Sequence, residues 1–405
     1  MKDILLISYT FPPYPGIGGR RWAKFAKYLT KLGYTVHVVC AKNPLKTSSF
    51  YINDVLLENI KVYSFESMFP RVLLNPKPQT LFEKLRYKFW MLVLPVFVKG
   101  YIFDKAIFDE KKIFSLSKKI ITDNNIKNVI VTGAPFRINY YSLKLKEFFP
   151  DINLIQDFRD PWTWGKQYSA LTIEAKDFET KMLTKVVEAA DVITVPVMPM
   201  KDYLCKNYSS LSKKIHVLPH AFDADEITVK SDFRENSFKC AFFGTIYSDI
   251  ENYFDILTKL IHNESGKMTL DIFSDSFKYQ EIVKKNNAND WIQYKKTLVG
   301  KTLFDTLSNY DYVVFIYPSY VKDFISTKFY EIISSKIPII YIGEDGVASN
   351  FISNNNLGIH VNENTIDGKL KDFIDGKLNW HYNHNYSVEE YSFYNVSNQV
   401  SNFFV

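Results

Sequence analysis

The sequence predicts an α/β protein made of two Rossmann-like, doubly wound domains, each built on a parallel sheet. Short apolar, β-branched runs alternate with helical patterns in the first half of the chain, and the same rhythm restarts after a polar stretch that ends at Ser237. This alternation indicates strands that are joined by crossover helices. A length of 405 residues also favours two domains over a single core.

The first domain is predicted from strands that alternate with helices. The helix Arg20–Leu32 carries apolar side chains on one face, and Gly33 ends it. A second helix is expected over Ile173–Ala190. The predicted strands are Ile4–Ser8, Thr35–Cys40, Asn128–Thr132, Asn153–Gln156 and Asp191–Val195.

The second domain is predicted to face the first across a cleft. Its expected strands are Phe238–Phe243, Met268–Phe273, Trp291–Tyr294, Asp311–Tyr317, Ile337–Ile342 and Gly358–Val361. A helical apolar pattern over Val388–Phe404 predicts a C-terminal helix that packs back on the first domain. The expected boundaries are residues 1–221 for the N-terminal domain, 222–385 for the C-terminal domain and 386–405 for the returning helix.

Composition excludes several classes of function. The net charge is only +6 and no long basic block occurs, which argues against a nucleic-acid partner. The three cysteines lie far apart and form no metal motif, so we expect no disulfide framework and a reducing, cytoplasmic setting. The apolar run Ile4–Ile7 is too short for a signal peptide.

The segment Lys322–Glu331 is the strongest candidate site. It follows one predicted strand and precedes another, so it lies at the carboxyl end of a strand, where open α/β sheets bind ligands. A helix start with Ser326, Thr327 and Lys328 suits a phosphate group. Carboxylates suit sugar hydroxyls, because they accept hydrogen bonds from a diol. Asp323 and Glu331 therefore favour a nucleotide-sugar site, although each could also be an ordinary surface charge.

Glycines precede the first predicted helix and follow the first strand of the second domain. Gly18 and Gly19 allow backbone amides to approach a phosphate or sugar closely, with a ligand-free tight turn as the alternative. Gly244 and Thr245 offer the same close approach and a hydroxyl donor. The first loop lacks the third glycine of a GxGxxG motif, where Arg21 stands, which argues against a nicotinamide cofactor.

Two further segments leave alternatives open. The loop Asp157–Trp162 could present Asp160 to a substrate hydroxyl, or Arg159 and Asp160 could form a structural pair. The spacing of these acids gives little support to a metal site. The basic and apolar stretch Leu81–Phe103 could rest on a membrane surface or receive a lipid-linked acceptor. A long buried helix or an insertion is favoured, because Pro95 interrupts an amphipathic pattern.

Taken together, these segments resemble the retaining GT-B glycosyltransferases of glycosyltransferase family 4 over nearly the whole chain. The similar segments are the Pro-Pro and Gly-Gly opening between Tyr9 and Val39, Thr132-Gly133-Ala134-Pro135, a DxRDPW loop at Asp157–Trp162, the interdomain segment Val217–Asp223 and an E-x7-E-like spacing at Asp323–Glu331. The resemblance implies a GT-B fold and transfer of a sugar from a UDP- or GDP-sugar, with retention, to a glycan or lipid-linked acceptor. No cofactor and no metal are implied. A role in bacterial surface polysaccharide or lipopolysaccharide synthesis is expected, in the cytoplasm or at its face of the inner membrane.

The resemblance also implies roles for single residues. Glu331 would bind the donor ribose, and Asp323 would contact the donor sugar. Lys328 would hold the diphosphate together with the amides near Ser326 and Thr327. Gly244 and Thr245 would assist from the second domain, while Gly18 and Gly19 would close over the phosphates from the first. Lys328, Asp323 and Asp160 are the expected catalytic residues.

This chain departs from the family at two positions. Asp323 replaces the usual glutamate, and no Arg/Lys pair follows Gly244. Neutralising the leaving diphosphate then falls to Lys328, with Arg20 or Arg21 in reserve. Two alternatives stay open: a GT-B sugar-nucleotide epimerase, and a non-catalytic nucleotide-sugar-binding protein.

Overall fold

The computed structural model describes residues 2–45, 47–74, 77–230 and 238–405, and it separates into two compact units. Unit 1 comprises Met1–Pro219 and Phe393–Val405, and unit 2 comprises His220–Ser392. The boundaries predicted from the sequence lie after residues 221 and 385. The polar stretch that precedes the second domain lies partly at 231–237, outside the described residues.

The segment before Phe393 belongs to unit 2 because it is bound there. The amide of Phe222 donates to the carbonyl of Tyr391 over 3.0 Å, and the two segments form a β-bridge between Phe222 and Ser392. The rings of Tyr391 and Tyr330 lie 4.8 Å apart. These contacts place the border of the returning C-terminal segment at Ser392.

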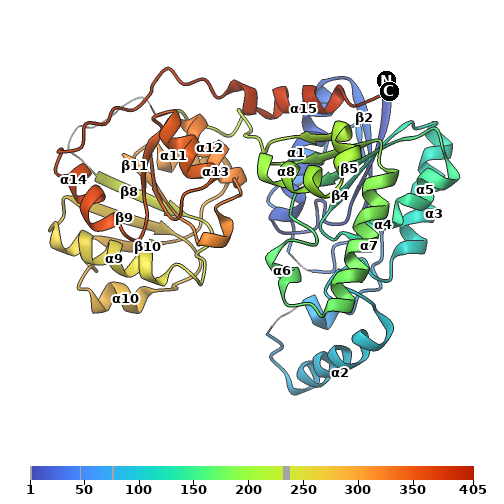
Figure 1. The fold of residues 1–405 in the computed structure, drawn as a ribbon, viewed down its shortest axis with the longest axis horizontal. Helices are drawn as coiled ribbons and strands as arrows, with labels where there is room; N and C mark the ends of the chain where they lie inside the picture. The colour runs from blue at the N-terminus through green and yellow to red at the C-terminus, as the bar shows by residue number, and fades with distance from the viewer. Residues whose placement is uncertain (1, 46, 75–76, 231–237) are drawn as a thin grey trace. The chain divides into compact units, whose positions relative to one another are not determined.

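Within the described residues, unit 1 contains a seven-stranded parallel sheet in the order β3-β2-β1-β4-β5-β6-β7 (Figure 1). All five predicted strands are present, and β3 and β7 are additional edge strands. The strands are β1 (Lys2–Ser8), β2 (Tyr34–Ala41), β3 (Ile60–Phe65), β4 (Asn128–Gly133), β5 (Asn153–Phe158), β6 (Val192–Val195) and β7 (Ile215–Val217).

Several helices cover this sheet with an apolar face. Ile113 and Ile120 of α3, for example, join one buried cluster with Leu5 of β1 and Val129 of β4. The helices of unit 1 are α1 (Arg20–Lys31), α2 (Leu81–Phe97), α3 (Glu110–Asn124), α4 (Arg137–Tyr141), α5 (Leu143–Phe148), α6 (Lys166–Ser169), α7 (Ile173–Ala189), α8 (Met198–Asn207) and α15 (Phe393–Ser401).

The C-terminal helix α15 packs on α1, as predicted. The ring of Phe393 lies 5.1 Å from Phe25 and stacks 6.0 Å from Tyr28. Both partners lie on the buried face of α1. The last segment of the chain therefore completes unit 1.

Unit 2 contains a six-stranded parallel sheet in the order β10-β9-β8-β11-β12-β13, again within the described residues. All six predicted strands are present. They are β8 (Phe238–Phe243), β9 (Met268–Phe273), β10 (Ile292–Lys295), β11 (Tyr312–Ile316), β12 (Ile339–Ile342) and β13 (Gly358–Val361). The helices are α9 (Glu251–Asn263), α10 (Gln280–Lys285), α11 (Gly300–Leu307), α12 (Thr327–Ser335), α13 (Val347–Asn354) and α14 (Lys371–Ile374).

Each sheet has one topological switch point, where successive connections leave to opposite sides. In unit 1 it lies between β1 and β4, and in unit 2 between β8 and β11. Ligands of open α/β sheets bind outside the carboxyl ends of the strands at such points. A binding site is therefore expected in the loops that follow β1, β4, β8 and β11.

The helix α2 differs from the expectation drawn from its sequence. Pro95 does not end it, since the helix continues for two residues beyond the proline, to Phe97. The side chain of Thr80 accepts from the amide of Glu83 in a capping box that begins the helix. The prediction of a buried helix is wrong, because Leu94 is the one residue of α2 that is fully buried. Among the described residues, no helix has the length and apolar character needed to cross a bilayer.

Candidate functional site

The switch point of unit 2 brings Gly244 and Lys328 into contact. Gly244 follows β8 with a φ of +100°, a conformation that side chains rarely allow. A β-carbon at this position would lie 1.5 Å from Nζ of Lys328. The ammonium group also lies 5.5 Å from the ring centroid of Phe243. The lysine thus lies across the carboxyl end of β8, where only glycine leaves room for it.

The start of α12 is open to an anion. Ser326 occupies the N-cap position but its side chain makes no capping hydrogen bond. Its hydroxyl lies 2.9 Å from the hydroxyl of Tyr317, whose pKa is raised by burial. The first amides of α12 therefore have no side-chain cap, and the partial positive charge of the helix N-terminus adds to that of Lys328.

The loop that carries Asp323 is fixed to the next connection in unit 2. The amide of Val347 donates to the carbonyl of Lys322 over 2.8 Å. A β-carbon at Gly346 would lie 2.1 Å from the same carbonyl oxygen, so this approach also requires glycine. Asp323 itself is exposed at the turn. Its carboxylate is available to solvent at the carboxyl end of β11.

Glu331 lies three residues after Lys328 on α12, so the two side chains leave the same side of the helix. The glutamate is 7% exposed. Thr327 is half-buried in the first turn, and Thr245 is exposed after Gly244. The predicted residues of unit 2 therefore lie after the neighbouring strands β8 and β11, where Gly244 and Lys328 are in contact; Glu331 is buried, and Asp323 and Thr245 are exposed.

The equivalent switch point of unit 1 is held together by Arg159. This residue follows β5, and its guanidinium donates to the carbonyl of Gly18 and, over 2.9 Å, to that of Ala134. Its Nε also pairs with Asp160 at 3.2 Å. One side chain thus links the loops after β1 and β4, while the Asp160 carboxylate remains largely exposed.

The two glycines of the first loop are packed differently. Gly19 is buried, and a β-carbon there would lie 2.8 Å from the carbonyl of Thr10. At Gly18 a β-carbon would lie 3.0 Å from the Thr10 hydroxyl and 3.1 Å from Arg159. Gly19 therefore allows the loop to fold on itself, and Gly18 is the half-buried residue of the pair.

Asp157 and Arg21 have structural positions. The Asp157 carboxylate is fully buried and accepts hydrogen bonds from Trp22, Thr132 and Thr194 over 2.7–2.8 Å. Arg21 lies 3.6 Å from it and donates to two carbonyls of the Val217–Asp223 segment, those of Leu218 and Pro219. Its charge is committed inside unit 1. Arg20 is buried too, with its guanidinium over the ring of Tyr51.

An open pocket of about 330 Å³ lies beside the first loop of unit 1. This volume is within the usual range of small-molecule sites. Its walls combine aromatic rings with a few charged groups, which is the common composition of such sites. The residues are Thr10, Tyr14, Pro15, Gly16, Gly18, Tyr101, Phe103, Asp104, Lys105, Ala134, Pro135, Arg159, Gln167 and Tyr168.

Two ionisable groups in this pocket have shifted pKa values. Burial raises the pKa of Asp104 to about 6, although its carboxylate accepts from the amides of Ala106 and Arg137. Burial, and next the charge of Arg159, lowers the pKa of Lys105. The Lys105 and Arg159 cations suit an anionic group in the pocket.

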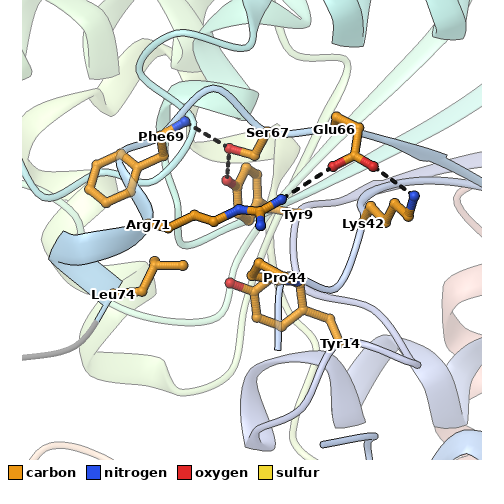
Figure 2. A pocket seen from close by; sticks show the side chains of 9 residues that line it. All are labelled: Tyr9, Tyr14, Lys42, Pro44, Glu66, Ser67, Phe69, Arg71 and Leu74. Carbon is orange, nitrogen blue, oxygen red and sulfur yellow. Dashed lines mark hydrogen bonds and ion pairs between the residues drawn. The ribbon is translucent and has the colours of Figure 1, made fainter. Parts of the chain in front are cut away.

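A second, much smaller pocket is also lined by Tyr14 (Figure 2). Its volume of about 10 Å³ would hold at most one water molecule. Its polar groups satisfy one another: Tyr9 donates to Ser67 over 2.7 Å, and Glu66 pairs with Lys42 and Arg71. We therefore assign it a structural role.

The larger pocket was not predicted, although Tyr101 and Phe103 belong to the stretch Leu81–Phe103, for which an acceptor-binding role was one of the alternatives. Tyr101, Phe103 and Lys105 follow α2 in an irregular segment with no recognisable motif. Tyr317 was included in a predicted strand, without a role at the site. The position of Tyr317 directly after β11 is a signal that could have indicated it, since strand ends bind ligands.

Solved structures with similar folds extend over almost the whole chain. Sucrose-phosphate synthase (tll1590) from Thermosynechococcus elongatus has a TM-score of 0.67 and 12% identity, covering 99% of this chain and 98% of that chain. The lipopolysaccharide outer core galactosyltransferase WaaB in its apo form has a TM-score of 0.65 and 11% identity, covering 100% and 99%. The chain has the GT-B fold.

The same GT-B fold also occurs in a UDP-N-acetylglucosamine 2-epimerase, with a TM-score of 0.53 and 12% identity over 98% of this chain and 94% of that chain. Identities this low show the fold and no more. No protein-family profile matches the sequence. No curated protein matches it at a significant level either.

Proposed function

We propose that this protein transfers a glycosyl group from a nucleoside diphosphate sugar, with UDP or GDP as the nucleotide, to a glycan or lipid-linked acceptor. The observation that carries the proposal is the contact of Lys328 with Gly244 at the uncapped start of α12. A cation, a helix start without a side-chain cap and a glycine at neighbouring strand ends suit an anion. Glycosyltransferases among the structures of the same fold support this choice.

In this reaction, unit 2 would stabilise the diphosphate leaving group. The bond between the anomeric carbon and the diphosphate breaks, and negative charge develops on the phosphate oxygens. Lys328 and the first amides of α12 are aligned in advance to receive that charge, which is the most effective form of electrostatic catalysis. Such a site needs no metal and no Arg/Lys pair after Gly244, because Lys328 occupies the place beside that glycine.

The two acids would bind the remaining parts of the donor. Glu331, buried on the Lys328 side of α12, would accept hydrogen bonds from the ribose hydroxyls. Asp323, exposed at the turn, would accept from the sugar. Both roles follow the resemblance of the Asp323–Glu331 segment to family 4 glycosyltransferases.

Unit 1 would bind the acceptor in the pocket between Tyr14 and Tyr168. The acceptor hydroxyl attacks the anomeric carbon from the face that the diphosphate leaves, so the configuration is retained, and its proton passes to the departing diphosphate. Exclusion of water would keep the donor from hydrolysis. A bacterial surface polysaccharide or a lipopolysaccharide is the product class that we propose.

Calorimetry with UDP and GDP tests the donor site directly. Lys328→Met should weaken binding by roughly 10- to 100-fold, since charged hydrogen bonds have that worth. Lys301→Met, an exposed lysine of unit 2, is the matched control and should leave the affinity unchanged. Wild-type affinity in Lys328→Met would refute the assignment of the phosphate site.

The reaction type is tested with nucleotide sugars. Transfer should depend on acceptor, and proton NMR should show the anomeric configuration of the donor in the product. Formation of an epimeric nucleotide sugar without acceptor would favour the epimerase, a function that some structures of this fold have. Tight nucleotide binding without transfer across an acceptor panel would favour a non-catalytic binding protein.

A further inference from the structure

The helix α2 carries a continuous apolar stripe on its solvent side. Six apolar residues, spaced mainly by three or four positions, lie on this side, so they form one face of the helix. Each side chain is 57–77% exposed. We call this face the outward stripe, and it consists of Leu81, Phe82, Leu85, Phe89, Leu92 and Val96.

The opposite face of α2 is occupied already. Leu94 and the following Val98 join a buried cluster with Phe69, Leu73 and Ile107, against which Tyr87, Trp90 and Met91 also pack. This inward packing anchors the helix on unit 1, where Figure 1 shows it projecting beyond the sheet and its other helices. Within unit 1, the outward stripe is not needed to hold α2 in place.

Basic residues border the outward stripe on both sides. Lys84 and Lys88 lie one turn apart along one edge, and Arg86 lies along the other. The guanidinium of Arg86 lies 5.6 Å from the ring of Phe82. The one acid of α2, Glu83, accepts from the amides of Gln79 and Thr80 at the helix start. The rim of the stripe is therefore cationic.

We propose that the outward stripe of α2 docks on an anionic lipid bilayer. An exposed apolar face with a polar rim marks an interaction surface. Aromatic and aliphatic side chains at the centre with lysine and arginine at the edges are the composition that partitions into the headgroup boundary of an anionic membrane. The long basic side chains keep their charge at the headgroups while their stems lie on the apolar surface.

This docking goes beyond the proposed glycosyl transfer and does not depend on it. Docking would also bring the bilayer near the proposed acceptor pocket. Val98 ends the inward contacts of α2, and Tyr101, Phe103 and Lys105 follow within a few residues and line the pocket. A membrane bound to α2 would therefore lie close to the part of unit 1 that forms this wall of the pocket.

Sedimentation of the full-length protein with vesicles tests the proposal. Vesicles of equal parts phosphatidylcholine and phosphatidylglycerol should bind the protein, and vesicles of phosphatidylcholine alone should bind it much more weakly. Leu85→Glu with Leu92→Glu should reduce binding by about tenfold or more for each leucine that no longer enters the bilayer. Both residues are exposed, so the fold should be unaffected.

A matched control uses exposed apolar residues elsewhere in unit 1. Ile173→Glu with Met198→Glu adds the same charge at side chains that are 83% and 53% exposed, and should leave vesicle binding unchanged. Replacing Lys84, Arg86 and Lys88 by glutamine should reduce binding by about fivefold for each cation, and the loss should diminish at high salt.

The outcomes separate the alternatives. Equal sedimentation of wild type and the Leu85→Glu, Leu92→Glu variant would overturn the proposal. So would a dimer in light scattering that this variant dissociates without any vesicle binding, because the stripe would then join two copies of the chain. UDP binding measured on the same variants should remain normal, so a failure of the donor site is distinguishable from a failure of docking.

Discussion

Nζ of Lys328 occupies the space that a β-carbon at position 244 would need, 1.5 Å from where that carbon would lie. A lysine at the start of one helix and a glycine at the end of a neighbouring strand are thus a single structural feature. Each requires the other: a side chain at 244 would displace the ammonium group, and no basic residue directly follows the glycine to replace it.

Gly244→Ala should weaken nucleotide binding in addition to destabilising the fold. The positive φ of +100° is unfavourable for alanine, at roughly 1–2 kcal/mol. The methyl group also displaces Lys328 from the anion site, so UDP affinity measured by calorimetry should fall by about tenfold or more. Gly376→Ala is the control, because Gly376 has a φ of +68° with open space around its α-carbon. Equal UDP affinities in the two variants would contradict the prediction.

Arg159→Lys should impair transfer while leaving UDP binding by unit 2 intact. Lysine keeps the charge but cannot reach the carbonyls of Gly18 and Ala134 at once, as the planar guanidinium does. We expect kcat to fall by about tenfold or more because the first loop loses its position. Asp160→Asn is the companion variant. A large loss of kcat there, with UDP affinity retained, would support the predicted catalytic role of Asp160, and a small one would leave it as a partner of Arg159.

Asp157→Asn should destabilise unit 1. The carboxylate accepts hydrogen bonds from Trp22, Thr132 and Thr194, and an amide nitrogen would face at least one of these buried donors. The expected cost is about 2–4 kcal/mol in the free energy of unfolding. Urea denaturation followed by tryptophan fluorescence measures it, with the exposed Asp151→Asn as control. A midpoint within error of wild type would show that the network does not stabilise the unit.

The raised pKa of Asp104 predicts that the stability of the protein depends on pH. Burial raises the pKa of its carboxyl from 3.8 to about 6, so between these values the folded protein holds a proton that the unfolded chain has lost. Its contribution to the free energy of unfolding therefore falls as pH rises from about 4 to 6, by up to about 3 kcal/mol, and is constant above.

Asp104→Asn removes this titration. The free energy of unfolding of the variant minus that of wild type should then rise with pH across the same window, whatever the constant cost of the lost hydrogen bonds. Parallel curves for the two proteins, measured by urea denaturation at a series of pH values, would rule out the titration.

The sequence predicted central strands better than edge strands. Buried strands such as β11 and β12 are continuous apolar runs in the sequence, because helices cover both faces of a parallel sheet. The edge strand β3 has exposed residues at three of its six positions, and β7 is only three residues long. Neither gives a periodic signal, and both were missed.

At other positions the sequence allowed more than one interpretation, and only the contacts in the folded protein distinguished between them. Asp157 and Arg159 stand in one polar loop, yet the first is buried in a hydrogen-bond network and the second links two loops. The apolar residues of α2 fit a buried helix as well as an exposed one. Whether these residues are exposed depends on the segments of unit 1 that pack beside them. The periodicity of the sequence carries no information about those segments.

The two parallel sheets and the location of the candidate residues at strand ends could be predicted, because both follow from local patterns of apolar and turn residues. The strand ends that meet in space could not be predicted in this way. The pairing of β8 with β11 brings Gly244 to Lys328, and Arg159 joins the loops after β1 and β4. Strand order fixes these contacts through hydrogen bonds between segments that are distant in the chain, and no local pattern encodes that order.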